Sequence, residues 1–156
     1  LSWATSDISR FDLPARFAIK IPGGAAHRPA KRWPPEGYRA LGENWLEQGV
    51  TPVIVCGPDE TDLAAEIADG REMVNLAGET SFADIAELSC RAAGAVGNDT
   101  GPMHIAAICN CPSVVLFSDE SDPSITAPRG PDVQVLRREK LADLPVSEVA
   151  ETLSLR

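Results

Sequence analysis

Residues 97–104 have the composition best suited to chemistry, because they read Gly-Asn-Asp-Thr-Gly-Pro-Met-His and precede a predicted helix. Gly101 permits close approach of a ligand to the backbone, and Pro102 suits the first position of a helix. Free backbone N–H groups from Thr100 to His104 would point out of the helix N-terminus, where the helix dipole favours an anion. His104 would add a further donor. The segment therefore predicts a phosphate site, and Asp99 would cap the turn or accept a hydrogen bond from a ligand hydroxyl or amine.

A second candidate is the glycine- and proline-rich loop at residues 22–34, next to the only dense basic cluster in the chain. The cluster comprises Arg28, Lys31, Arg32 and Arg39. The chain as a whole carries 14 basic and 23 acidic residues, a net charge of −9, which disfavours nucleic-acid binding. The loop matches neither G-x-G-x-x-G nor G-x-x-x-x-G-K-[ST], so a nicotinamide dehydrogenase and a nucleoside triphosphatase both lose support.

Each of these residues also has a purely structural interpretation. Asp99 could only cap its helix, and His104 could be an ordinary first-turn histidine. Lys31 and Arg32 could be solvated surface charges, and Glu60 could be a first-turn acid that the helix dipole favours. The residue pattern alone leaves these alternatives open.

The four cysteines are Cys56, Cys90, Cys109 and Cys111, and their spacing gives no zinc motif. We expect buried thiols in a reducing compartment and no metal site. Cys56 and Cys109 follow apolar runs, so both are expected to be small core residues.

The elements that must position these residues alternate between strand-like and helix-like patterns. This alternation predicts an α/β fold, a Rossmann-like parallel sheet with helices on both faces. Strands are predicted at residues 17–21, 51–56, 73–76, 94–97, 112–117 and 133–136. Helices are predicted at residues 36–48, 59–69 capped by Asp59, 82–91 capped by Ser81, 102–109 and 147–155, with a loop at 118–132. Ligands of such sheets bind outside the carboxyl ends of the strands.

The 156 residues, 44% of them hydrophobic, are enough for one domain with its own core. Residues 1–16 are aperiodic and are expected to be a linker or an exchanged segment, and residues 17–156 the domain. No run of about 18 apolar residues occurs and no initiator Met is present, so a soluble, excised piece is expected.

Four segments together resemble glycosyltransferase family 9, the ADP-heptose:lipopolysaccharide heptosyltransferases. They are Pro-Gly at 22–23 with Lys-Arg-Trp-Pro at 31–34, Gly-Pro-Asp-Glu at 57–60, Asn-Leu-Ala-Gly at 75–78, and residues 97–104. Their order and spacing agree with the C-terminal domain of that family. The similarity covers about residues 17–117, and residues 97–104 are its most specific part.

The resemblance implies the two-domain GT-B architecture, in which this chain is the C-terminal, donor-binding domain and the N-terminal acceptor domain is absent. It implies that Lys31, Thr100, Gly101 and His104 contact the diphosphate of a nucleotide-sugar. Glu60 would bind the ribose, and Asp99 would hold hydroxyls of the transferred heptose.

The implied reaction transfers a heptose from ADP-heptose to a lipopolysaccharide-core hydroxyl with inversion, without metal or cofactor. The general base belongs to the absent domain, so no catalytic residue is expected in this chain and the isolated chain is expected to be inactive. The implied partners are the nucleotide-sugar, the absent domain and, through it, a lipid-linked glycan acceptor. The implied location is the cytoplasm, peripheral to the inner face of the bacterial inner membrane.

Two departures from the family pattern leave the exact donor open. Ser-Asp-Glu at 118–120 replaces the usual Gly-Pro-Thr, and Cys-Asn-Cys at 109–111 replaces a turn of small residues and glycine. The alternatives are a GT-B-like nucleotide-sugar epimerase and a non-catalytic Rossmann-like binding or assembly module. Joint placement of Lys31, Glu60, Asp99 and His104 on ligand-facing loops would favour the transferase.

Overall fold

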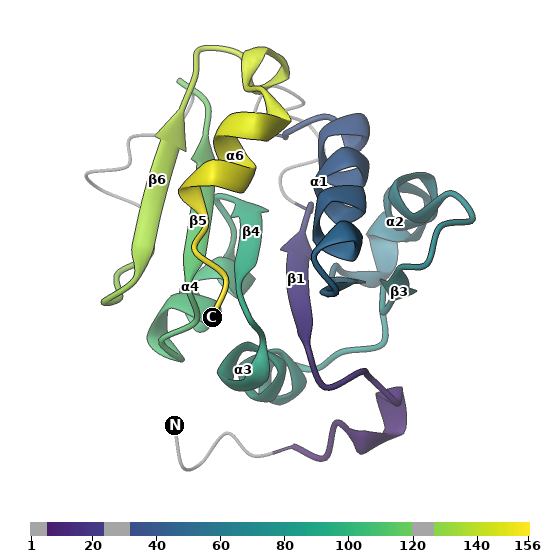
Figure 1. Ribbon diagram of the computed structural model, residues 1–156. Helices are drawn as coiled ribbons and strands as arrows, with labels where there is room; N and C mark the ends of the chain where they lie inside the picture. The colour runs from purple at the N-terminus through teal and green to yellow at the C-terminus, as the bar shows by residue number, and fades with distance from the viewer. Residues whose placement is uncertain (1–5, 24–31, 120–126) are drawn as a thin grey trace.

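A computed structural model describes residues 6–23, 32–119 and 127–156, and its centre is a six-stranded parallel sheet (Figure 1). The strands are β1 (Phe17–Ile21), β2 (Thr51–Ile54), β3 (Val74–Asn75), β4 (Ala95–Asn98), β5 (Ser113–Phe117) and β6 (Val133–Arg137). All neighbouring strands pair in parallel. The predicted fold class is confirmed.

Helices cover both faces of the sheet (Figure 1). One face packs against α1 (Pro35–Glu47), α2 (Thr61–Ala68) and α6 (Val146–Thr152), and the other against α3 (Phe82–Arg91) and α4 (Gly101–Ile108). Strand side chains alternate between the two cores, so that Ala18 and Val96 face α1 while Ile19 and Ile21 face α3 and α4. This double coverage explains why β1, β4 and β5 are buried along their whole length and are mostly apolar.

The strand order is β3-β2-β1-β4-β5-β6, so the chain reverses direction across the sheet between β3 and β4. β1 and β4 are therefore neighbours, with Ile21 paired to Gly97. Gly97 is required by this close packing, because a Cβ there would lie 2.8 Å from the Ile21 carbonyl oxygen. The crevice outside the carboxyl ends of β1 and β4 is the switch point, where ligands of open α/β sheets bind.

Three local predictions are wrong. Asp59 does not cap a helix, because Pro58 starts a 3-10 turn, η3 (Pro58–Glu60), and α2 begins only at Thr61. The α4 helix begins at Gly101, which leaves Pro102 in its second position. Not all four thiols are buried: Cys90 is exposed near the end of α3, and Cys109 is only half-buried because it lies beyond the end of α4, whereas Cys56 is in the core as predicted.

Residues 6–16, the described part of the chain before β1, pack against the body of the domain. They contain a short turn, η1 (Ser9–Phe11), and the buried side chain of Ile8. Arg10 donates to the Asp84 carboxylate over 2.6 Å, which ties this segment to the N-terminus of α3. A further 3-10 turn, η4 (Leu141–Asp143), precedes α6 and was not predicted.

Across the part of the chain that the structure describes, no helix has the length and apolar character that crossing a bilayer requires.

Candidate functional site

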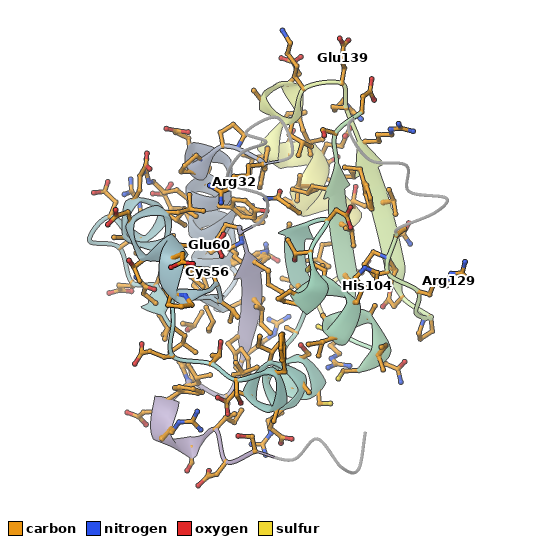
Figure 2. The ribbon with its side chains drawn as sticks, turned by 180° about the vertical axis from the view of Figure 1, so that it is seen from behind. Arg32, Cys56, Glu60, His104, Arg129 and Glu139 are labelled. Carbon is orange, nitrogen blue, oxygen red and sulfur yellow. The ribbon has the colours of Figure 1, made fainter. Side chains whose placement is uncertain are left out.

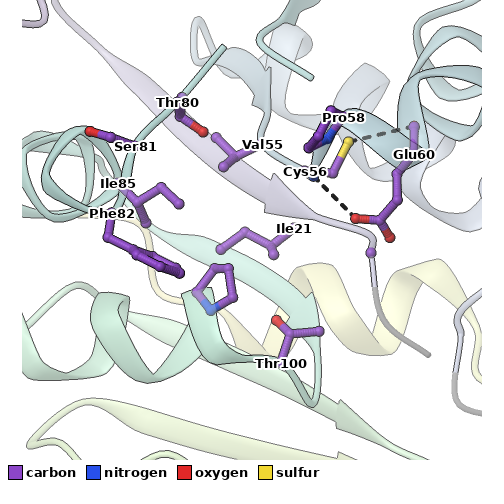
Figure 3. Close-up of a pocket in the computed structure, with 13 residues that line it drawn as sticks. Ile21, Val55, Cys56, Pro58, Glu60, Thr80, Ser81, Phe82, Ile85 and Thr100 are labelled. Atoms are coloured by element: carbon purple, nitrogen blue, oxygen red, sulfur yellow. Dashed lines mark hydrogen bonds between the residues drawn. The ribbon is translucent and has the colours of Figure 1, made fainter. Parts of the chain in front are cut away.

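A cavity of about 590 Å³ opens at the carboxyl ends of β1 and β2 and beside the N-termini of α3 and α4 (Figure 3). Its lining comes from loops far apart in the sequence: Ile21, Gly23, Val55, Cys56, Gly57, Pro58, Glu60, Thr80, Ser81, Phe82, Ile85, Thr100 and Pro102. The cavity therefore lies beside the switch point, where the sheet topology places a ligand. Glu60 and Thr100, two of the predicted site residues, line it together.

Glu60 stands on one wall of the cavity, at the end of η3. Its carboxylate accepts a hydrogen bond from the Gly57 N–H over 3.1 Å and from Arg32 over 3.2 Å. The Gly23 backbone lies directly against it, since a Cβ on Gly23 would be 2.4 Å from both carboxylate oxygens. Glu60 is thus more than a first-turn acid, because three segments fix its carboxylate at the cavity wall.

Thr100 stands on another wall of the cavity, at the N-cap position of α4. Its side chain makes no capping hydrogen bond, and its buried Oγ1 has no hydrogen-bond partner among the described residues. The next residue, Gly101, has open space where a Cβ would lie, so packing within the protein does not require glycine there. An unsatisfied buried hydroxyl and an unobstructed helix N-terminus suit an anionic ligand.

The floor and rim between these walls are mostly apolar. Ile21, Val55 and Ile85 form the floor, and the Phe82 side chain at the rim is 72% exposed (Figure 3). Burial raises the pKa of the Cys56 thiol to about 11, so Cys56 adds no charge at neutral pH. The cavity combines apolar lining residues with the polar side chains of Glu60 and Thr100, an arrangement typical of small-molecule sites.

The other predicted site residues do not line the cavity in the described part of the chain. Asp99 is half-buried in the turn next to Thr100, while His104 is exposed on α4 and does not line the cavity. Figure 2 shows His104 apart from the group formed by Arg32, Cys56 and Glu60. The Arg39 guanidinium binds the Glu66 carbonyl on α2 instead of the cavity. Arg28 and Lys31 lie outside the described residues.

Asn98 is a feature of the site that the sequence pattern did not single out. Its buried side chain joins β4 to both ends of the loop that follows β1. It accepts hydrogen bonds from the Trp33 N–H over 3.1 Å and the Tyr38 hydroxyl over 3.0 Å. It donates to the carbonyls of Pro22 over 2.9 Å and Gly23 over 3.3 Å.

Asp119, one of the two acids that depart from the family pattern, is not among the residues that line the cavity. Its carboxylate lies 3.3 Å from the Arg137 guanidinium, at the end of β6. The pairing offsets the negative charge that this substitution brings to the end of β5.

A second cavity, of about 680 Å³, lies between α1, α2 and η4. Its lining is Arg32, Trp33, Pro34, Pro35, Asp62, Leu63, Glu66, Lys140, Leu141 and Ala142. It includes neither Glu60 nor any residue of the turn after β4. Since sheet topology places ligands at that turn, the first cavity is the better candidate.

Comparison with known proteins gives a match to one family model, described as glycosyltransferase family 9 (heptosyltransferase), over residues 8–152. Lipooligosaccharide heptosyltransferase 2 of Haemophilus influenzae is 34% identical over 131 residues, 80% of this chain and 38% of that protein. Lipopolysaccharide heptosyltransferase 2 of Escherichia coli K12 is 32% identical over 120 residues, 73% of this chain and 34% of that protein. The chain thus spans less than half the length of these curated relatives.

Solved structures agree. The E. coli ADP-heptose lps heptosyltransferase II superimposes with a TM-score of 0.84 at 28% identity, over 97% of this chain and 49% of that one. The E. coli heptosyltransferase WaaC with ADP gives a TM-score of 0.79 at 25% identity, over 90% of this chain and 45% of that one. On the family match, the two curated relatives and these superpositions, this chain belongs to glycosyltransferase family 9, the heptosyltransferases.

Proposed function

We propose that this chain is the donor-binding half of a heptosyltransferase that moves a heptose from ADP-heptose to a lipopolysaccharide-core acceptor with inversion. The observation that carries the proposal is the cavity at the switch point, which has Glu60 on one wall and the unpartnered Thr100 hydroxyl on the other. A solved relative, WaaC, was determined with ADP, the nucleotide that this donor would release.

The apolar floor would receive the adenine base, with the exposed Phe82 ring as a face on which it can stack. Glu60 would then accept hydrogen bonds from ribose hydroxyls, because Arg32 and the Gly57 N–H already orient its carboxylate toward the cavity. Asp99 would hold hydroxyls of the heptose.

The diphosphate would lie at the N-terminus of α4, against the Thr100 hydroxyl and the Gly101 backbone. Negative charge grows on the diphosphate as the bond to the sugar breaks. Lys31, the helix N-terminus and His104 would stabilise that charge, and the helix N-terminus would do so without reorganising because α4 is already formed. The exposed side chain of His104 would reach the outer oxygens rather than the cavity floor.

Residues 17–156 would form the donor domain and residues 1–16 the connection to an acceptor domain. That second domain would carry the general base that deprotonates the acceptor hydroxyl, and it would meet the lipid-linked glycan at the inner face of the bacterial inner membrane. This chain by itself would bind donor without transferring sugar.

Calorimetric titration with ADP and UDP tests the proposal. We expect saturable ADP binding, weaker UDP binding, and at least tenfold weaker ADP binding in a Lys31→Ala/His104→Ala double variant. The matched control is Arg39→Ala, since Arg39 binds α2 away from the cavity. A folded chain that prefers UDP would overturn the adenine assignment, and one that binds neither nucleotide would overturn the donor-domain assignment.

A further inference from the structure

Asn98 is the last residue of β4 and lies two positions before Thr100, which lines the cavity. Its side chain is 1% exposed and hydrogen-bonds groups 60 to 76 positions away in the sequence. A buried amide whose hydrogen-bond partners all belong to the protein links the segments that carry those partners.

The partners fix the orientation of the amide. The Trp33 backbone N–H can only donate, so the atom that it meets is the Asn98 oxygen. The Pro22 and Gly23 carbonyls can only accept, so the atom that they meet is the Asn98 nitrogen. An amide can accept from the Trp33 N–H and also donate to the Pro22 and Gly23 carbonyls. A carboxylate has no donor, and an aliphatic group has neither donor nor acceptor.

Both the hydrogen bonds that Asn98 accepts and those that it donates connect to the Glu60 side of the cavity. Gly23 lies against the Glu60 carboxylate, as the 2.4 Å approach of a Cβ built there shows. Trp33 follows Arg32, whose guanidinium pairs with the same carboxylate over 3.2 Å. The backbone of Asn98 itself continues into Thr100 and the start of α4, which form the other wall.

We propose that Asn98 is a positioning residue that sets the spacing between the Glu60 wall and the Thr100–Gly101 wall of the nucleotide cavity. The inference rests on the proposed function, since that spacing has to match the distance from ribose to diphosphate in a bound nucleotide. Asn98 touches no substrate in this role and acts through Gly23, Arg32 and the α4 N-terminus.

The Asn98→Asp variant distinguishes the hydrogen bonds that Asn98 accepts from those that it donates. Its carboxylate can accept from Trp33 and Tyr38, but its second oxygen faces the carbonyls of Pro22 and Gly23 and repels them. Asn98→Leu removes both sets of hydrogen bonds. Tyr38→Phe is a milder variant, because the Asn98 oxygen keeps the Trp33 N–H.

Amide hydrogen exchange of the nucleotide-free chain tests the connection without any ligand. We expect the Trp33 N–H and the Gly57 N–H, which Glu60 holds, to exchange at least about tenfold faster in Asn98→Leu and in Asn98→Asp than in the wild type. The matched control is Ser113→Ala, which removes a buried hydrogen bond of 2.7 Å at the amino end of β5, remote from the cavity. Unchanged exchange at Gly57 in both Asn98 variants would overturn the proposal.

ADP titration supplies the second readout. Asn98→Asp should weaken ADP binding at least about tenfold, whereas Ser113→Ala should leave it unchanged. In the Asn98→Asp background, Glu60→Ala should add less than twofold, because Glu60 is already displaced. Full additivity of the two substitutions would contradict a positioning role. A wild-type chain that binds no ADP would instead contradict the proposed function, and the exchange measurement would still decide whether Asn98 sets the walls.

Discussion

Thr100 is the described residue whose surroundings call most directly for a ligand. Its hydroxyl oxygen is buried and has no hydrogen-bond partner among the described residues, a state that costs free energy in the unliganded protein. A phosphate oxygen at the N-terminus of α4 would satisfy the hydroxyl. The same hydroxyl oxygen therefore destabilises the unliganded protein and, in our proposal, binds the phosphate.

Thr100→Val tests this link, because valine keeps the shape and removes the hydroxyl. We expect the free energy of unfolding to stay the same or rise by about 1 kcal/mol, while ADP binding weakens roughly tenfold. Thermal unfolding and calorimetry measure the two effects. Thr51→Val, at the amino end of β2, is the control and should leave ADP affinity as in the wild type. Undiminished ADP affinity in Thr100→Val would separate the orphan hydroxyl from nucleotide binding.

Lys20 is a second residue that the fold buries at a cost. Its side chain is fully buried beneath α1, and its ammonium lies 3.2 Å from the Tyr38 carbonyl oxygen and 3.0 Å from the Met73 sulfur. Burial lowers the pKa of Lys20 from 10.5 to about 7, against the opposing attraction of Glu43. The cost of the buried charge is present in full below pH 7 and fades as the pH rises toward 10.5.

Lys20→Met should therefore stabilise the protein, by on the order of 3 kcal/mol at pH 6 and by much less at pH 10. Chemical denaturation at the two pH values measures the difference. Lys140→Met, on an exposed lysine, should show no such dependence on pH. An equal gain from Lys20→Met at both pH values would mean that Lys20 does not titrate as described.

At the scale of elements, the N-terminus of α3 joins the segment before β1 to the rim of the cavity. Ser81 and Asp84 form a reciprocal capping box, and Asp84 also accepts from Ser6 and Arg10. Burial by itself would raise the pKa of Asp84, but the hydrogen bonds from Arg10, Ser6 and Ser81 outweigh it and hold that pKa well below its usual range. This stability is present above the ordinary pKa of about 3.8 and is lost as the pH falls below it.

Asp84→Ala should lower the free energy of unfolding at pH 7 by about 1–3 kcal/mol, because it removes the cap and leaves its partners unmet. The loss should shrink as the wild type itself is acidified from pH 5 to pH 2. Arg10→Ala is the comparison, and it should cost under about 1 kcal/mol because half of the Arg10 side chain is exposed. Equal losses from the two variants would show that the ion pair, and not the capping box, holds this segment.

Most elements were predictable because the chain repeats local patterns. Every predicted strand and helix has a counterpart, since the apolar runs of β1 and β5 and the Ser81 cap of α3 are visible in adjacent residues. The residue pattern pointed to Thr100, in the turn after a strand, whereas Glu60 was singled out only by the family resemblance, and both line the cavity. The strand order was not predictable, because the pairing of β4 with β1 depends on contacts between distant segments. The role of Asn98 escaped for the same reason, since its partners lie 60 to 76 positions away.

At the scale of the whole molecule, the parallel sheet places the site. The order β3-β2-β1-β4-β5-β6 brings the ends of β1 and β4 together, and the loops after β1, β2 and β4 meet there. Two-sided coverage by helices keeps these strand ends fixed while leaving the loops to carry the chemistry. The family relationship agrees with this division, because heptosyltransferase structures share the fold over 90% or more of this chain.

A crystal structure of the chain with ADP would show whether the nucleotide binds at the switch point, as we propose. We expect the diphosphate within hydrogen-bonding distance of the Thr100 hydroxyl and the Gly101 N–H, the ribose at Glu60, and the base beside Phe82. ADP seated instead in the second cavity, against Lys140 and the start of α1, would contradict this proposal.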